Sequence, residues 1–253
     1  MDVLKVFLSD DDPANRDKLI ACLADGEEVE LVGTADTPEG TVEAVCALCP
    51  HAVLLNMEER PATDTLSALR TAGLKYVPFL LVVEGDGRGL PDAGRYGADY
   101  VLSKARFGNG WPRGAADALR TFASQARRKR EQSARQFELD ALRRRRIGEE
   151  LDKVGISRKN TRARRYLTEA IRLSMDGQQP FLYYTLAQLY EREGASEATV
   201  ALVMERAIDR AWRSGFADQG ALYQGRVSLY RGSPAVTDFI RHYAEKLKNE
   251  ELQ

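Results

Sequence analysis

The chain has 253 residues and a mass of 28.2 kDa, with 43% apolar and 30% charged residues and a mean hydropathy of −0.41. At roughly 100–200 residues per domain, this length predicts two domains. No apolar run approaches the roughly 18 residues of a membrane span, and residues 1–12 lack the features of a secretory signal, so we expect a cytoplasmic protein without membrane contact. Three cysteines are too few for a disulfide framework, and two histidines argue against an enzyme that depends on several imidazoles.

Charge is divided unevenly between the two halves. Residues 1–124 hold 12 Lys and Arg against 20 Asp and Glu, a net charge of −8, and residues 125–253 hold 25 against 18, a net charge of +7. The positive charge is concentrated in residues 127–172, which carry 16 basic and 7 acidic side chains. This basic half predicts contact with a polyanion, although a solvated basic helix surface explains the same pattern.

The first half alternates short apolar runs with segments of helical periodicity. Strands are expected at 4–8, 29–32, 52–55, 78–83 and 100–102. Helices are expected after Pro13, at 37–48 and at 62–72. This alternation predicts an α/β fold with a doubly wound parallel sheet, in which functional sites lie at the C-terminal ends of the strands.

The second half begins with a basic helical segment. Residues 115–147 contain no Pro or Gly, which predicts one long helix that leaves the first domain as a linker; a flexible charged linker is the alternative. Residues 148–155 are expected to connect this helix to an all-helical second domain. Its helices are expected at 161–175, 181–191, 196–213, 219–227 and 234–248.

Two of these helices, 181–191 and 196–213, are a helix-turn-helix candidate. Ser196 is a suitable N-cap for the second helix. Val200, Met204 and Ile208 recur at helical spacing in that helix and are expected to face inward. The alternative is ordinary helix packing without DNA contact.

Polar side chains follow three of the expected strands. Asp10, Asp11 and Asp12 come after the first strand, Asn56 ends the third, and Lys104 comes after the fifth. Clustered carboxylates repel each other and favour a cation or a basic partner, so this edge predicts either a weak divalent cation site or an acidic turn that caps the next helix.

The first half resembles a response-regulator receiver domain. The resemblance lies in SDDD at 9–12, VLLN at 53–56, GADYVLSK at 97–104 and the five-strand alternation. It implies a flavodoxin-like fold, with the magnesium-binding acidic pair at Asp10 and Asp11. It also implies that Lys104 is the receiver lysine and that Tyr100 is the aromatic switch residue.

Four departures from the receiver pattern are visible, and the first two bear directly on its chemistry. The phospho-acceptor aspartate position holds Asn56, and the Ser/Thr position after the fourth strand holds Val83. The usual Met-Pro after the acceptor is replaced by residues 58–60, and the proline after the lysine by Ala105. Phosphoryl transfer needs a carboxylate nucleophile, so we interpret the domain as a pseudo-receiver with weakened divalent cation binding and no other cofactor.

The second half resembles the helix-turn-helix effector domain of the stage zero sporulation protein A family. The resemblance lies in LTEAIRLS at 167–174, LAQLYEREGASEATVALVMERAIDRAWRSG at 186–215 and SPAVTDFIRHYAEKLK at 233–248. It implies promoter DNA binding, with dimers on tandem sites. The turn before the second helix is longer than in that family by about three residues.

The DNA-reading surface also departs from that family. Glu197 and Glu205 repel phosphates, and Ala198 and Ala201 offer only apolar contacts, so the specificity of readout is in question. The residues that we expect to contact DNA are Ser196, Thr199, Leu202, Arg206, Arg162, Arg164 and Arg165.

These observations predict a pseudo-receiver over 1–124, a basic helical linker over 125–149 and a helix-turn-helix effector domain over 150–253. The leading hypothesis is a non-enzymatic paralogue of the sporulation response regulator, a transcription regulator that binds DNA and ignores phosphorylation. It is expected to form homodimers or heterodimers through the pseudo-receiver. The alternative is an interaction protein that does not read DNA and that pairs with or antagonises the authentic regulator or its phosphorelay partners.

Overall fold

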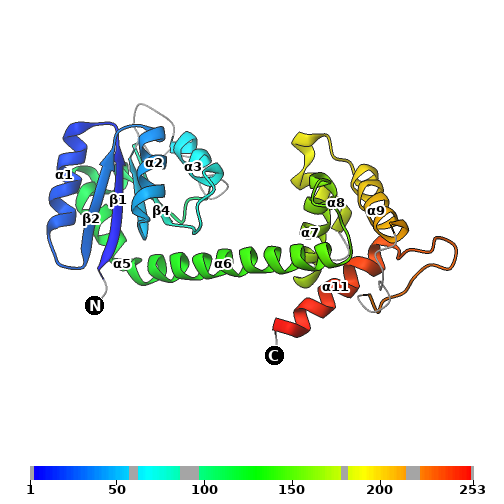
Figure 1. Ribbon diagram of the computed structural model, residues 1–253. Helices are drawn as coiled ribbons and strands as arrows, with labels where there is room; N and C mark the ends of the chain where they lie inside the picture. Colours follow the sequence, from blue (N-terminus) through cyan, green and yellow to red (C-terminus); the bar gives the residue numbers. More distant parts are fainter. Residues whose placement is uncertain (1–2, 57–61, 86–96, 178–181, 215–222, 252–253) are drawn as a thin grey trace. The chain divides into compact units, whose positions relative to one another are not determined.

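The computed structural model describes residues 3–56, 62–85, 97–177, 182–214 and 223–251 (Figure 1). The chain forms two compact units, residues 1–138 and 139–253, and each is described by itself. The domain limits expected at 124 and 150 stay predictions.

Unit 1 is built around a five-stranded parallel sheet. Its strands are β1 (Leu4–Asp10), β2 (Val29–Ala35), β3 (Ala52–Asn56), β4 (Phe79–Glu84) and β5 (Tyr100–Ser103). Their order in the sheet is β2-β1-β3-β4-β5. This is the flavodoxin-like doubly wound order, so the expected fold class is confirmed. The fully buried residues of β3 and the almost fully buried residues of β4 are typical of central strands covered on both faces.

Helices cover both faces of this sheet (Figure 1). The helices of unit 1 are α1 (Pro13–Ala24), α2 (Pro38–Leu48), α3 (Ala62–Thr71), the short α4 (Lys104–Phe107) and α5 (Trp111–Thr121). Side chains of α1 and α5 share one core cluster with one face of the strands, and side chains of α2 and α3 share a second cluster with the other face. The period of two along each strand divides its apolar residues between these two layers.

Unit 2 is helical. Its elements are the C-terminal part of α6 (Ala123–Lys153), α7 (Thr161–Met175), α8 (Leu182–Leu189), the 3-10 turn η3 (Glu191–Glu193), α9 (Glu197–Arg213) and α11 (Val236–Glu251). One buried cluster joins these five described helices, with Tyr166, Phe239 and Tyr243 as its largest fully buried side chains. The expected all-helical second half is confirmed for α7, α8, α9 and α11.

The structure corrects the long helix expected over 115–147. The chain leaves helical geometry at Phe122, between α5 and α6, where its ring lies 5.5 Å from that of Phe79 and 4.9 Å from that of Tyr100. The helix then continues through Gly148, because Ile147, Leu151 and other residues around the glycine are buried in the core of unit 2.

The expected helix at 219–227 is wrong for residues 223–227, which form an irregular segment. Residues 219–222 lie outside the described part of the chain. The same holds for residues 58–60, which replace the receiver Met-Pro, and for Phe181, at the start of the helix expected over 181–191.

Leu54 provides a test of this architecture, because it is fully buried in central strand β3. Leu54→Ala is expected to lower the free energy of unfolding of unit 1 by about 2–5 kcal/mol through lost burial and a cavity. Urea denaturation followed by Trp111 fluorescence in a Trp212→Phe background measures it, since Trp111 lies in unit 1. Leu48→Ala is the control, with a much smaller loss because Leu48 is 44% exposed. Equal losses would contradict this core assignment.

Candidate functional site

The first candidate site lies at the C-terminal edge of the sheet in unit 1. The register of β1 and β3 places Asp10 directly opposite Asn56. Both side chains are fully buried, and Asn56 Nδ2 donates a hydrogen bond of 2.7 Å to Asp10 Oδ2. The backbone N–H of Asp12 donates to Asp10 Oδ1 at 2.9 Å. The carboxylate of Asp10 is therefore held by two neutral donors.

Burial raises the pKa of Asp10, and the hydrogen bonds from Asn56 and Asp12 and the charge of Lys104 counteract part of that rise. Burial likewise lowers the pKa of Lys104, and the charges of Asp10, Asp12 and Asp11 oppose this shift. The ammonium of Lys104 also lies 4.4 Å from the centre of the Trp111 ring. The structure thus brings the acidic residues and the lysine into one electrostatic site.

The remaining pocket residues supply no reactive group. Asn56 Oδ1 is buried without a hydrogen-bond partner, although Asn56 Nδ2 is bonded. Val83 is buried at the end of β4 and has no hydroxyl. Tyr100 packs against Phe122, within unit 1. Among the described residues, no group of three His, Cys, Asp or Glu side chains is arranged to hold a metal ion.

The acidic run also has a structural role. Asp12 is the N-cap of α1, and its carboxylate accepts a hydrogen bond of 2.8 Å from the backbone N–H of Ala14. The capping alternative therefore accounts for Asp12, whereas the buried carboxylate of Asp10 faces Asn56.

The second candidate site is the helix-turn-helix segment of unit 2. Helices α8 and α9 are separated by residues 190–196, which include the 3-10 turn η3. Ser196 caps α9 by accepting a hydrogen bond of 3.2 Å from the backbone N–H of Thr199, and the two hydroxyls lie 2.9 Å apart. Leu202 and Arg206 are exposed on the same helix. A seven-residue separation is longer than the usual turn of three or four residues in this motif.

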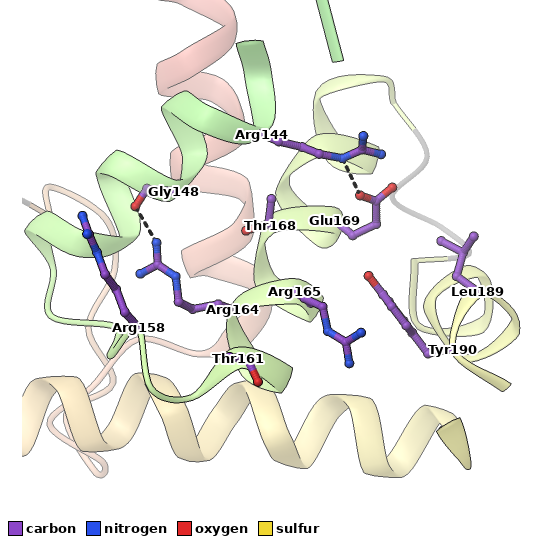
Figure 2. A pocket seen from close by; sticks show the side chains of 10 residues that line it. All are labelled: Arg144, Gly148, Arg158, Thr161, Arg164, Arg165, Thr168, Glu169, Leu189 and Tyr190. Atoms are coloured by element: carbon purple, nitrogen blue, oxygen red, sulfur yellow. Dashed lines mark hydrogen bonds and ion pairs between the residues drawn. The ribbon is translucent and has the colours of Figure 1, made fainter. Parts of the chain in front are cut away.

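A basic groove of about 730 Å³ lies beside this segment, within unit 2 (Figure 2). It is lined by Arg144, Gly148, Arg158, Thr161, Arg164, Arg165, Thr168, Glu169, Leu189 and Tyr190. Four of these side chains are arginines and one is a carboxylate. The charge of the lining favours an anionic ligand.

The groove arginines differ in how firmly the fold holds them. Arg164 donates to Asp152 Oδ1 at 2.6 Å and to the carbonyls of Ile156 and Gly148 at 2.8 and 2.9 Å, which occupies three of its five N–H groups. Arg165 forms a two-pronged ion pair with Glu193, at 2.9 and 2.5 Å, and its guanidinium lies 5.4 Å from the centre of the Tyr190 ring. Arg164 is thus a fold-stabilising residue, and Arg165 remains half-exposed in the groove.

The other groove arginines, Arg144 and Arg158, belong to basic runs that the sequence offers for phosphate contacts, but neither is among the individual residues expected to contact DNA. Arg158 pairs with Asp152 and stays largely exposed, and Arg144 lies 3.4 Å from Glu169. Arg162 lies outside the groove lining, and its guanidinium donates to the hydroxyl of Tyr166 at 2.9 Å. The basic runs at 143–146 and 158–165 were the available sequence signal, but which arginines converge depends on how α6 packs on α7.

Comparisons with solved structures find response regulators. The signal receiver domain of NarL from Mycobacterium tuberculosis is 22% identical over 49% of this chain and 98% of that chain, with a TM-score of 0.41. The response regulator domain of Thermotoga maritima CheB is 18% identical over 51% and 98%, with a TM-score of 0.42. The RcsB response regulator of Salmonella typhimurium is 16% identical over 88% and 97%, with a TM-score of 0.39.

No protein-family model matches the chain, and no curated protein matches it in sequence. The assignment of the fold therefore rests on the strand order of the sheet.

In the part of the chain that the structure describes, no helix combines the length and apolar character needed to cross a membrane.

The Asp10–Asn56 contact generates a prediction with a defined pH dependence. Asn56→Asp replaces a hydrogen-bond donor by a second buried carboxylate and is expected to lower the free energy of unfolding by roughly 1–3 kcal/mol at pH 7. Like-charge contact raises the pKa of the folded pair above its unfolded value. The folded state then binds more protons than the unfolded state, so the loss shrinks as the pH falls toward the unfolded carboxylate pKa.

Urea denaturation between pH 4 and 8, at about one-unit steps, measures this dependence, with and without magnesium. Magnesium is expected to restore part of the lost stability in Asn56→Asp but not to stabilise the wild-type chain. Asn160→Asp is the matched control, because Asn160 is the N-cap of α7, where either residue accepts the same bond. A pH-independent loss in Asn56→Asp would contradict the electrostatic account.

Proposed function

We propose that this protein is a transcription regulator of the response-regulator type whose receiver is not switched by phosphoryl transfer. The observation that carries the proposal is the buried amide of Asn56, hydrogen-bonded to Asp10, at the position where a receiver has its acceptor carboxylate. An amide is neutral and too weak a nucleophile to form an acyl phosphate. Val83 at the neighbouring strand end offers no hydroxyl to a phosphoryl oxygen.

The second unit is proposed to regulate transcription by binding DNA. Residues 167–174, 186–215 and 233–248 resemble the effector of the sporulation response regulator, and the surface beside α8 is basic. Within that surface, Arg144, Arg158 and Arg165 are exposed enough to contact phosphates, which gives affinity without base reading. Because the receiver has no phosphorylation switch, DNA binding then depends on the concentration of the protein or on a partner bound to unit 1. That partner is a second copy in a homodimer or another protein in a heterodimer.

A specific observation supports a second function. The first turn of α9 exposes Glu197 and Ala198, and Leu202 is 43% exposed one turn further on. An acidic and apolar helix face suits a protein partner better than the base edges of a major groove. The alternative is therefore an interaction protein that pairs with an authentic sporulation regulator or its phosphorelay partners without reading DNA.

Incubation with acetyl phosphate and magnesium tests the proposal for the receiver. The wild-type chain is expected to acquire no acyl phosphate, because it lacks a carboxylate at residue 56. Intact-mass measurement and Phos-tag electrophoresis report the modification, with an authentic receiver domain as the positive control. A stable acyl phosphate on the wild-type chain would refute the phosphorylation-independent reading.

Arg165→Ala and Arg164→Ala form a matched pair for the DNA proposal. Arg165→Ala is expected to weaken duplex binding and to reduce the slope of log affinity against log salt by about one unit. Arg164→Ala is expected instead to lower the free energy of unfolding by about 1–3 kcal/mol, since it leaves the Gly148 and Ile156 carbonyls and Asp152 without this donor.

Fluorescence anisotropy of a labelled duplex over a KCl series gives the slopes, and thermal denaturation gives the stabilities. Sequence-dependent binding at physiological salt supports the regulator, and no binding of the wild-type chain at low salt favours the interaction protein. A slope changed by Arg164→Ala alone would reverse the roles assigned to these two arginines.

A further inference from the structure

The segment that enters α11 carries two large apolar side chains with no contact to the fold. Leu229 and Tyr230 have relative exposures of 101% and 102%, and Val227 beside them is 46% exposed. In Figure 1 the orange loop before α11 projects away from the helices of unit 2. Single exposed apolar residues are common on protein surfaces, but adjacent, fully exposed Leu and Tyr side chains at the tip of a loop indicate an interaction site.

This loop, residues 226–232, is held in a defined shape. The backbone N–H of Gly232 donates to the carbonyl of Ser228 at 2.9 Å, and the N–H of Ser228 donates to the carbonyl of Ser233 at 3.1 Å. Gly232 has a φ of +66°, which favours glycine in a tight turn. On its N-terminal side, buried Tyr223 donates from its hydroxyl to the carbonyl of Arg226 at 3.3 Å. The tip is therefore presented by a closed turn.

The loop is also tied to α9, the helix expected to contact DNA. Arg231 forms an ion pair with Glu205, and the hydroxyl of Ser233 bonds the carboxylate of Asp209, one turn further along α9. These contacts fix the loop relative to α9. They also neutralise Glu205, whose free carboxylate would repel a phosphate.

The loop itself carries basic side chains and no acidic ones. Residues 223–237 contain no carboxylate side chain and two arginines, Arg226, which is exposed, and Arg231, which is paired with Glu205. On the neighbouring helix, Arg206, Arg210 and Arg213 are exposed. An apolar and aromatic tip between arginines is complementary to a polyanion whose bases present flat apolar faces, which is the chemistry of nucleic acid.

We propose that the 226–232 loop binds duplex DNA by inserting Leu229 and Tyr230 at a deformable base step in the minor groove. This inference rests on the proposed DNA binding and adds a mode of recognition to it. Apolar side chains that enter the minor groove unstack neighbouring base pairs and kink the duplex, most easily at pyrimidine–purine steps such as TA and CA. Recognition then depends on DNA deformability, which compensates for the few base-reading side chains at the start of α9.

The test uses the full chain, a labelled duplex of about 20–30 base pairs with central TA and CA steps, and 2-aminopurine at those steps as a reporter of unstacking. Wild-type protein is expected to increase the 2-aminopurine fluorescence. The double variant Leu229→Ala/Tyr230→Ala is expected to bind about 10-fold more weakly and to lose that increase. Leu142→Ala is the control, because Leu142 is a 47% exposed leucine on α6, in the same unit but outside the loop and the helix-turn-helix segment.

Thermal denaturation checks that the double variant is folded. We expect it to fold, because both substituted side chains are fully exposed and make no packing contacts. Equal affinity and equal fluorescence for the double variant and the wild-type chain would overturn the insertion proposal and leave DNA binding intact. Unchanged DNA affinity with an altered oligomeric state in sedimentation would instead assign the loop to a contact between copies and likewise overturn it. No binding of the wild-type chain to any duplex at low salt would overturn the proposed function together with this inference.

Discussion

The hydrogen bond from Asn56 to Asp10 sets the chemistry of the first unit. It joins two fully buried polar side chains at the ends of neighbouring strands, where the flavodoxin-like fold places its sites. An amide can donate to Asp10, whereas a carboxylate at residue 56 would repel it unless a cation or a proton intervened. The site is therefore stabilised without the cation that a second carboxylate would require.

The same contact explains the electrostatics of its surroundings. Burial favours the protonated form of Asp10 and the neutral form of Lys104, and each group counteracts the shift of the other through its charge. The ring of Trp111 lies beside the Lys104 ammonium and adds a favourable contact. Together these residues form a set of mutually compensating charges. Asn56 Oδ1 is the one site atom left without a hydrogen-bond partner among the described side chains of this cluster.

The second unit separates two uses of arginine. Arg164 binds two carbonyls and a carboxylate inside the fold, so its charge serves the packing of α6 on α7. Arg158 and Arg165 are paired with Asp152 and Glu193 but remain accessible. A phosphate that bound there would compete only with an exposed ion pair, which contributes little to the free energy of folding. A run of positive charge in a sequence therefore overstates the number of guanidinium groups that a ligand can reach.

The sequence by itself determined the strands, most of the helices and the identity of the pocket residues. Apolar periodicity located all five strands and helices such as α7, and motif spacing brought Asp10, Asn56 and Lys104 to one edge of the sheet. Local signals sufficed there, because strand period and chain order fix which residues end each strand.

The tertiary structure decided what depends on partners distant in the chain. The break at Phe122 comes with ring contacts to Phe79 and Tyr100, and the passage of α6 through Gly148 accompanies burial of its neighbours in another core. The shape and exposure of the 226–232 loop likewise depend on its contacts with α9. Secondary-structure propensity and hydrophobic periodicity are local properties of the sequence, so they do not encode such contacts. These contacts stabilise the protein only after distant segments have been brought together by folding.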